Sequence, residues 1–263
     1  MKKFFVIGNP IDHSLSPKLH TYWIEKGNIK AVYEKKKLSD NELKNFIQKI
    51  KDKEIQGINI TTPFKKSVIP YLDELTVSAK KTQSVNTVYF ENDKIVGHNT
   101  DIEGFTNSIK HSNFNVSNKK IFILGAGGVV SSIILALKNM NASRISVSNR
   151  SLSKVDDLRV LFEDINVVDW GNLDDFDMII NATSLGLNKT DEIKLDFSKN
   201  IKNKFFYDLI YNPKMTNFLK LGKGLGNKIE NGKMMFIYQA AAAFEIWHGI
   251  RPKVDDDVIR FLD

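Results

Sequence analysis

The residues of this chain that could bind a phosphate lie in a glycine-rich turn, Gly125-Ala126-Gly127-Gly128, directly after the apolar run 121–124. Glycine lets the backbone turn tightly and approach phosphate oxygens that a Cβ would hold away. A helix through Leu137 and a second strand, 144–148, are expected next. This strand–turn–helix–strand order places the pyrophosphate of a dinucleotide at a helix N-terminus, so the segment predicts a dinucleotide site.

The residues after the second strand indicate which dinucleotide binds. An NAD site usually has an Asp or Glu there, which holds the ribose 2′-hydroxyl. This chain has Asn149, Arg150 and Ser151, with Lys154 one helical turn further on. A 2′-phosphate favours cations at this place and is repelled by a carboxylate. The sequence therefore predicts NADP as the cofactor, with Val129 at the end of the phosphate loop.

A glycine loop alone has a second interpretation, a tight strand–helix turn that binds no ligand. Val130 stands where the third glycine of the fingerprint falls, and Ser131 follows it. Arginine is scarce in this chain, so Arg150 directly after the second strand favours a phosphate contact; a solvated surface arginine is the alternative. Lys154 supplies charge without the planar fork of a second arginine, so the NADP preference could be softer.

Composition sets the class of protein. The chain has 263 residues, 42% hydrophobic and 26% charged, which is ordinary for a globular protein of one large or two modest domains. It contains no cysteine, which excludes disulfides, thiolate metal sites and a cysteine nucleophile. The net charge of +7 suits phosphate and carboxylate ligands. The lysines are scattered, however, and no run is long enough to span a membrane, so we expect a cytoplasmic protein that binds neither nucleic acid nor membrane.

Strand and helix signals alternate along the whole chain. Expected strands are 4–7, 31–33, 57–60, 85–90, 94–97, 121–124, 144–148, 178–180 and 205–207. Expected helices are 17–27, 40–51, 101–110, a helix through 137, 152–163 and 233–248. We expect two α/β domains: 1–100 with 236–263, and 101–235. The second would be a Rossmann-like doubly wound domain, and the active site would lie in a cleft between the two.

Polar motifs stand at the ends of these elements, and their order resembles one family. They are 12–17 (DHSLSP), 59–65 (NITTPFK), 84–87 (SVNT), 97–101 (GHNTD), 181–184 (NATS), 208–213 (DLIYNP), 231–232 (NG) and 239–241 (QAA). From Ser14 to Trp247 the chain resembles the shikimate dehydrogenase family. The resemblance implies NADPH-dependent reduction of 3-dehydroshikimate to shikimate, on the route to chorismate and the aromatic amino acids. It also implies an N-terminal substrate domain and a C-terminal NADP-binding domain, in a monomer or homodimer.

The resemblance also implies roles for single residues. Ser14 and Ser16 would hold the substrate carboxylate, and the alternative for both is capping of the helix that Pro17 begins. Lys65 would be the general acid/base, with Asp101 paired to it and bonded to a ring hydroxyl. The alternative for a lone lysine is a solvated surface. Reducing a ketone needs a proton for the nascent alkoxide, and a lysine beside a carboxylate in a closed cleft meets that need.

Further ligands follow from the same resemblance. Thr61 and Asn86 would bind the remaining hydroxyls of the substrate, with Gln239 approaching from the last long helix. Tyr211 would offer its hydroxyl to the substrate, or it is a packed aromatic residue. The resemblance and the strand ends imply cofactor contacts from Thr183, Ile210 and Gly232. The alternative for Ile210 is core packing, and the alternative for Gly232 is a helix start. His13 and His98 are expected to be hydrogen-bonding neighbours, and no metal site is expected.

Three rival functions remain open on the sequence. A quinate/shikimate dehydrogenase that also uses NAD would be expected to have an acidic residue near Arg150, which the sequence lacks. A catalytically inactive NADPH-binding regulator would not need the Lys65–Asp101 pair. A nucleic-acid-binding protein is the most distant alternative, because basic runs interleaved with aromatic residues are missing.

Overall fold

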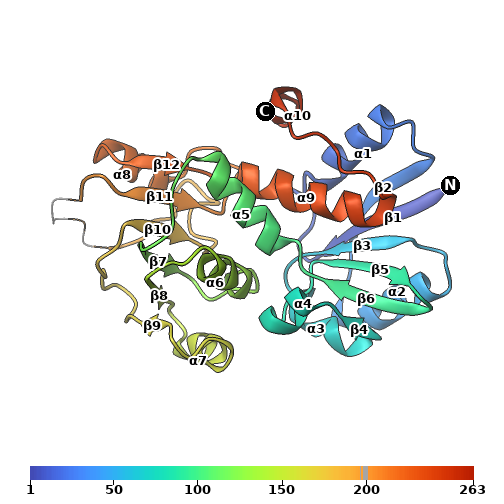
Figure 1. The fold of residues 1–263 in the computed structure, drawn as a ribbon, viewed down its shortest axis with the longest axis horizontal. Helices are drawn as coiled ribbons and strands as arrows, with labels where there is room; N and C mark the ends of the chain where they lie inside the picture. The colour runs from blue at the N-terminus through green and yellow to red at the C-terminus, as the bar shows by residue number, and fades with distance from the viewer. Residues whose placement is uncertain (196, 198–200) are drawn as a thin grey trace. The chain divides into compact units, whose positions relative to one another are not determined.

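The structure, a computed structural model, describes residues 1–195, 197 and 201–263. The chain forms two compact units (Figure 1): unit 1 comprises Met1–Gly104 with Ile237–Asp263, and unit 2 comprises Phe105–Phe236. The unit boundaries fall inside two helices, α5 (Asp101–His111) and α9 (Lys233–His248). No helix in the described part of the chain is long and apolar enough to cross a membrane.

Unit 1 is built on a mixed six-stranded sheet with the order β2-β1-β3-β5-β6-β4. Its first strand is parallel to both of its neighbours, whereas β5 is antiparallel to β3 and β6. The strands are β1 (Lys2–Gly8), β2 (Ala31–Lys37), β3 (Gly57–Ile60), β4 (Glu74–Leu75), β5 (Thr87–Glu91) and β6 (Lys94–His98). The helices that begin in this unit are α1 (Ser16–Lys26), α2 (Asp40–Lys51), α3 (Phe64–Ser67), α4 (Val77–Thr82), α5 and α10 (Asp256–Phe261), with a 3₁₀ turn at Ile69–Tyr71.

Local sequence explains two of these elements directly. Ser39 caps α2 through a capping box, in which Glu42 Oε2 accepts the Ser39 N–H at 2.8 Å. The β5–β6 hairpin closes over Asn92 and Asp93, both at positive φ (50° and 60°), as a tight hairpin turn requires. A buried apolar cluster, including Ile7, Ile58, Phe64 and Val88, then holds the helices against the sheet. These contacts fix the strand ends from which the polar motifs project.

Unit 2 contains a six-stranded sheet in which every pair is parallel. The spatial order is β9-β8-β7-β10-β11-β12, so the strands taken in sequence run 3-2-1-4-5-6, the order of the dinucleotide-binding fold. The strands are β7 (Lys120–Leu124), β8 (Arg144–Ser148), β9 (Asn166–Val167), β10 (Met178–Asn181), β11 (Phe205–Asp208) and β12 (Lys228–Glu230). The helices are α6 (Val130–Asn139), α7 (Leu152–Leu161) and α8 (Asn217–Gly224), with α9 starting at Lys233.

The predicted α/β class with a Rossmann-like second half is confirmed. The four inner strands of unit 2, β7, β8, β10 and β11, are almost entirely buried, and Phe122, Leu124, Ile179 and Phe206 belong to its core. Boundaries differ by a few residues. The strand predicted from residue 85 begins at Thr87, because the Val85 N–H is already bonded to the Lys65 carbonyl at 2.8 Å.

Candidate active site

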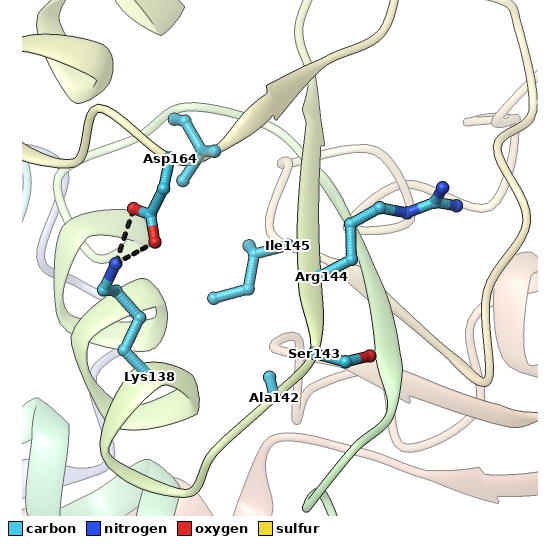
Figure 2. Close-up of a pocket in the computed structure, with 7 residues that line it drawn as sticks. Lys138, Ala142, Ser143, Arg144, Ile145 and Asp164 are labelled. Carbon is cyan, nitrogen blue, oxygen red and sulfur yellow. Dashed lines mark hydrogen bonds and ion pairs between the residues drawn. The ribbon is translucent and has the colours of Figure 1, made fainter.

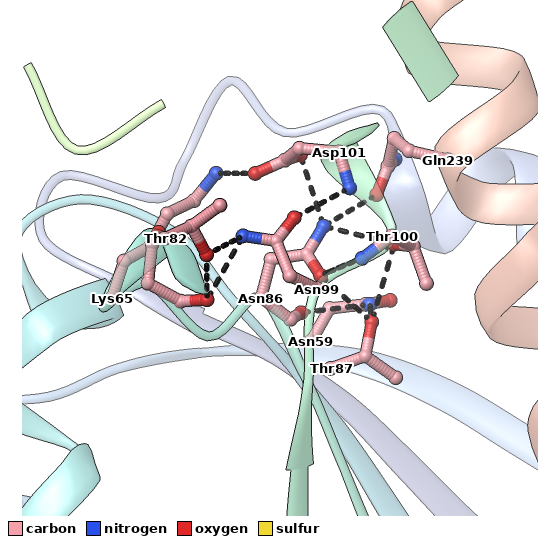
Figure 3. Close-up of polar contacts among 10 residues, drawn as sticks. Asn59, Lys65, Thr82, Asn86, Thr87, Asn99, Thr100, Asp101 and Gln239 are labelled. Atoms are coloured by element: carbon pink, nitrogen blue, oxygen red, sulfur yellow. Dashed lines mark hydrogen bonds and ion pairs between the residues drawn. The ribbon is translucent and has the colours of Figure 1, made fainter. Parts of the chain in front are cut away.

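Lys65 and Asp101 form an ion pair inside unit 1 (Figure 3). Lys65 lies on the one-turn helix α3, directly after Pro63, and Asp101 is the first residue of α5. The Lys65 Nζ lies 2.5 Å from the Asp101 Oδ2, and the two side chains are only 13% and 7% exposed. The pair is largely shielded from water, which strengthens the electrostatic attraction between the two groups.

Asn86 connects this pair to the strand behind it. Its Oδ1 accepts the Thr100 N–H at 2.8 Å, and because a backbone N–H can only donate, this bond fixes the orientation of the amide. The Nδ2 therefore faces Asp101 and donates to its Oδ1 at 2.9 Å, with Gln239 Oε1 at 3.4 Å. Both carboxylate oxygens of Asp101 thus have a donor, one from Lys65 and one from Asn86.

A second amide supports Asp101 from the other side. Asn99 Oδ1 accepts the Asp101 N–H at 3.0 Å, and Asn99 Nδ2 donates to Thr82 Oγ1 at 3.1 Å and to the Ser84 carbonyl at 2.9 Å. Asn99 and Thr82 are almost fully buried, at 2% and 0% exposed. Figure 3 shows this amide joining the segment that carries Asn86 to the start of α5.

A third amide, Asn59, lies below Asn86. Its Nδ2 donates to the Asn86 carbonyl at 3.1 Å and to Thr87 Oγ1 at 3.2 Å, and its Oδ1 accepts from the Tyr33 hydroxyl at 2.6 Å. Burial raises the pKa of Tyr33 well above its usual range, with the Ser16 hydroxyl acting in the opposite direction, so the phenol stays protonated and donates.

Ser14 and Ser16 stand at the start of α1. The Ser14 Oγ accepts the Ser16 N–H at 3.3 Å, Leu15 is the N-cap residue, and Pro17 lies in the first turn. Ser14 therefore accepts the first N–H of α1, although neither serine is the N-cap residue that the capping alternative predicts. Thr61 follows β3 and is half-buried. The carboxylate-binding role of the two serines and the hydroxyl-binding role of Thr61 stay predictions.

His98 has hydrogen-bonding neighbours of its own. Its Nδ1 lies 3.0 Å from Thr76 Oγ1 and 3.4 Å from Ser78 Oγ. Burial lowers the pKa of His98, with Glu103 opposing the shift, so the ring is neutral at physiological pH. A neutral ring held by two hydroxyls is consistent with a structural neighbour of the site.

In unit 2 the glycine loop connects β7 to α6. Gly125 has φ +110°, and a Cβ there would lie 2.8 Å from the Ala182 carbonyl oxygen, so only glycine fits. A Cβ at Gly127 would meet nothing within 4 Å, so the space beside this part of the loop is open. The helix begins at Val130, which is fully buried. The loop thus combines a tight turn, open space and a helix N-terminus, which fits a pyrophosphate.

A pocket of about 390 Å³ lies beyond the end of β8, lined by Asn149, Arg150, Ser151 and Lys154. Lys154 belongs to the first turn of α7, and Asn149 Nδ2 donates to the Ser151 carbonyl at 2.9 Å. Two cations and two polar side chains, with no carboxylate among these four residues, suit a phosphate monoester. The residues present therefore fit a cofactor with a 2′-phosphate.

A second pocket in the same unit is much smaller, about 50 Å³, and lies beside the start of β8 (Figure 2). Lys138 and Asp164 form an ion pair at one side, and Ile145 lines its floor. This volume holds roughly a few water molecules, so it does not compete with the larger pocket as a cofactor site.

The remaining candidate residues follow β10, follow β11 or precede α9. Thr183 donates its N–H and its hydroxyl to Asn181 Oδ1, at 3.1 and 2.7 Å. Ile210 is buried, and Tyr211 stacks on Phe236 with ring centroids 4.9 Å apart. A Cβ at Gly232 would lie only 2.0 Å from the Leu209 carbonyl oxygen, so backbone packing alone requires this glycine.

The structure therefore brings Lys65, Asn86, Asp101 and Gln239 together in unit 1, and Asn149, Arg150, Ser151 and Lys154 together in unit 2. Sequence reasoning missed the residues that hold the first group in place: Tyr33, Asn59, Thr82, Asn99 and Thr100. Three of them, Asn59, Asn99 and Thr100, lie within motifs that the sequence singled out. Their side-chain amide or hydroxyl beside a charged residue was the available signal.

Family models match three parts of the chain. Residues 6–88 match the shikimate dehydrogenase substrate binding domain, residues 108–213 match shikimate / quinate 5-dehydrogenase, and residues 235–256 match the shikimate 5′-dehydrogenase C-terminal domain. The shikimate dehydrogenase (NADP(+)) of Pelagibacter ubique is 56% identical over 262 residues, which cover 100% of this chain and 99% of that protein.

Solved structures agree with the sequence matches. A crystal structure of a shikimate dehydrogenase in complex with NADP+ superposes with a TM-score of 0.93 at 32% identity, over 100% of this chain and 95% of that chain. The Thermus thermophilus shikimate 5-dehydrogenase, solved with NADP(H) and shikimate, gives a TM-score of 0.88 at 28% identity, over 96% and 95% of the two chains. The resemblance predicted from the motifs is confirmed, and the chain belongs to the shikimate dehydrogenase family.

Proposed function

We propose that this chain catalyses the reversible NADPH-dependent reduction of 3-dehydroshikimate to shikimate, with Lys65 as the general acid/base. The observation that carries the proposal is the buried ion pair between Lys65 and Asp101, held by Asn86. Asn86 Nδ2 and Gln239 Oε1 lie 3.4 Å apart next to the pair, and both are groups that can bind ring hydroxyls.

In the reduction, the bound cofactor supplies the hydride that adds to the ketone carbon. Lys65 donates its Nζ proton to the carbonyl oxygen as negative charge develops there. Asp101 keeps the ammonium in place through its Oδ2 and accepts a hydrogen bond from the substrate hydroxyl. In the reverse direction, Lys65 takes the proton back from the shikimate hydroxyl. The polar side chains thus supply acid/base chemistry and orientation.

Binding of the rest of the substrate would use residues from several elements. Ser14 and Ser16 donate to the carboxylate, where the N-terminus of α1 also favours an anion. Thr61, Asn86 and Gln239 bind the ring hydroxyls. Tyr211 offers its hydroxyl from the edge of the ring that stacks on Phe236.

The cofactor would bind to unit 2, in keeping with the strand order and the loop geometry. Residues 125–129 hold the pyrophosphate, and Asn149, Arg150, Ser151 and Lys154 hold the 2′-phosphate. Thr183, Ile210 and Gly232 contact the nicotinamide half. Unit 1 would then be the substrate-binding domain and unit 2 the NADP-binding domain, in a cytoplasmic monomer or homodimer.

A second candidate is a dehydrogenase that accepts quinate as well as shikimate, which the description of the family model over residues 108–213 favours. Quinate carries the same carboxylate and ring hydroxyls, so the same side chains could bind it. An inactive NADPH-binding regulator is a third candidate, disfavoured by the intact Lys65–Asp101 pair.

The test is the absorbance of reduced nicotinamide when purified protein is mixed with each of four combinations: NADP+ or NAD+, with shikimate or quinate. We expect the highest kcat/KM for NADP+ with shikimate. A kcat/KM for quinate equal to that for shikimate would favour the second candidate. NADPH binding without turnover of either acid would favour the regulator and refute the proposal.

A further inference from the structure

A buried carboxylate that the proposed reaction does not use lies at the carboxyl end of β11. Asp208 is 0% exposed, and its two oxygens accept three hydrogen bonds. Oδ1 accepts the Ile210 N–H and the Asn181 Nδ2–H, both at 3.0 Å, and Oδ2 accepts the Thr216 hydroxyl at 2.6 Å. One side chain therefore ties together the ends of β10 and β11 and the start of α8.

The bond to Asn181 continues into the loop after β10. Asn181 Oδ1 accepts the N–H and the hydroxyl of Thr183, and its Nδ2 donates to the Leu185 carbonyl at 3.0 Å as well as to Asp208. The Thr183 N–H can only donate, so the Asn181 amide has one orientation, with its NH₂ toward the carboxylate. Asp208 thus sets the position of Asn181, and Asn181 sets the position of Thr183.

The bond to Ile210 continues toward α9. The Ile210 carbonyl accepts the Gly232 N–H at 3.2 Å, and the Leu209 N–H donates to the Asn181 carbonyl at 2.9 Å. The close approach of Gly232 to the Leu209 carbonyl leaves no room for adjustment between these backbone segments. One hydrogen-bonded network centred on Asp208, called the node below, therefore connects the three residues assigned to the nicotinamide half of the cofactor: Thr183, Ile210 and Gly232.

The node needs an ionised acceptor. Burial raises the pKa of Asp208 to about 6, while the hydrogen bonds from Thr216, Ile210 and Asn181 oppose the shift, so the carboxylate is ionised at pH 7 and above. A carboxylate offers only acceptors and can satisfy several donors at once. An asparagine in its place would turn an NH₂ group toward one of these donors and leave a buried bond unmade.

We propose that Asp208 is a positioning residue for the nicotinamide half of the cofactor, because its carboxylate fixes Thr183, Ile210 and Gly232 relative to one another. It acts through these residues and does not touch the cofactor itself. The inference rests on the proposed function, since it assumes that this chain binds NADPH on unit 2. The adenosine half, assigned to Asn149, Arg150, Ser151 and Lys154, lies outside the node.

The experiment compares two ligands by titration calorimetry with the full chain. NADPH contains both halves of the cofactor, and 2′,5′-ADP contains only the adenosine half with its phosphates. In Asp208→Asn we expect NADPH affinity to fall roughly 10- to 100-fold, as for the loss of a bond to a charged group, while 2′,5′-ADP affinity stays within about twofold. A merely structural role would weaken both ligands together.

Asp177→Asn is the matched control. Asp177 precedes β10 at the opposite end of the same strand, and its carboxylate accepts the Lys120 N–H at 2.9 Å. We expect it to change neither affinity. If Asp208→Asn does not fold, Thr216→Val removes the hydroxyl that donates to Oδ2 and that also accepts the Leu219 N–H at the start of α8. We expect selective loss of NADPH affinity, restored in Thr216→Ser, which keeps the hydroxyl.

Two outcomes overturn the inference: unchanged NADPH affinity in the folded Asp208→Asn or Thr216→Val protein, or an equal loss for NADPH and 2′,5′-ADP. Both outcomes can be distinguished from a failure of the proposed function itself. If that function is wrong because no NADP cofactor is used, the wild-type chain itself does not bind NADPH.

Discussion

At the scale of single residues, we expect cofactor choice to depend on Arg150, an exposed cation beyond β8. Arg150 and Lys154 line the same pocket, but only the guanidinium has the planar fork that matches two phosphate oxygens. Because the arginine is exposed, its charge is available to a ligand and is weakly coupled to the rest of the fold. The proposed preference for NADP over NAD should therefore be sensitive to this residue.

Arg150→Asp should weaken NADP+ binding roughly 10- to 100-fold, because repulsion replaces a charge-assisted hydrogen bond to the 2′-phosphate. NAD+ use should change little or improve. Arg159→Asp makes the same change in charge near the end of α7, away from the pocket, and should leave both cofactors unaffected. Steady-state KM values for NADP+ and NAD+ check this; if Arg150→Asp keeps its NADP+ affinity, Lys154 becomes the candidate selector.

Residue chemistry was predictable where a motif placed a charged or polar group at a strand end. Lys65, Asp101 and Asn86 were predicted because such motifs resemble those of one family, and the structure brings these residues into contact. Asn99, Tyr33 and Asp208 were not assigned roles, since their importance lies in hydrogen bonds to residues distant in sequence. Which acceptor a buried amide finds depends on tertiary packing, and a single sequence does not contain that information.

At the scale of elements, the start of α1 serves two possible purposes. Ser14 stabilises the first turn through the Ser16 N–H, and the same two hydroxyls are candidates for the substrate carboxylate. The free N–H groups at a helix N-terminus can bind a nearby side chain and can also attract an anion, so the two roles do not exclude each other. A functional measurement separates them, because only one role affects shikimate.

The double variant Ser14→Ala with Ser16→Ala should raise the KM for shikimate about tenfold or more, since each lost bond to a carboxylate contributes about 1.5–3 kcal/mol. The KM for NADP+ should not change. Ser39→Ala at the start of α2 removes a capping serine to which no ligand role is assigned, so it should lower the melting temperature and leave both KM values as they are. An unchanged shikimate KM in the double variant would leave the serines with the capping role alone.

Long periodic elements were predicted well, and short ones were not. The helix 40–51 and the strands 57–60 and 144–148 have the bounds that their sequence pattern predicts. The short elements α3, α4, β4 and β9 span six residues or fewer, too few for a period to emerge. The two short strands form because neighbouring strands supply their hydrogen bonds: β6 pairs with β4, and β8 pairs with β9.

At the scale of the whole molecule, stability should depend on a buried histidine in unit 1. His20 is 1% exposed, and neither ring nitrogen has a hydrogen-bond partner among the described residues. Its ring stacks on Tyr33 at 4.1 Å, with Trp23 and Trp247 around it. Burial lowers the pKa of His20 to about 3, and His248 adds to the shift, so the folded protein keeps this ring neutral.

Acidification should destabilise the folded protein through His20, because the unfolded chain binds a proton at this residue more readily than the folded chain does. Below the ordinary histidine pKa of 6.5, the unfolded chain binds a proton that folded His20 refuses, so stability falls as the pH drops toward about 3. At about 1.4 kcal/mol per unit, His20 should account for a loss of about 2 kcal/mol between pH 6.5 and about pH 5. His20→Phe keeps an aromatic ring against Tyr33 and should lose less stability over this interval.

Urea unfolding of the wild-type chain and of His20→Phe, each at pH 6.5 and at about pH 5, measures how much stability each protein loses on acidification. Asp208, whose pKa burial raises to about 6, titrates in the opposite direction, but it is common to both proteins and cancels in the comparison. If His20→Phe loses as much stability on acidification as the wild-type chain does, another group is responsible.

The central claim is that Lys65 transfers the proton in an NADP-dependent oxidation of shikimate, and the kcat of Lys65→Ala tests it most directly. The matched control is Lys66→Ala, which removes the exposed neighbouring lysine on the same helix. The account predicts that Lys65→Ala lowers kcat roughly 10²- to 10⁴-fold, the usual contribution of a positioned acid/base, with a smaller change in the KM for shikimate. Lys66→Ala should keep the wild-type kcat. A Lys65→Ala protein with near wild-type kcat and a raised KM would contradict the account, because Lys65 would then anchor the substrate and the proton would come from another group.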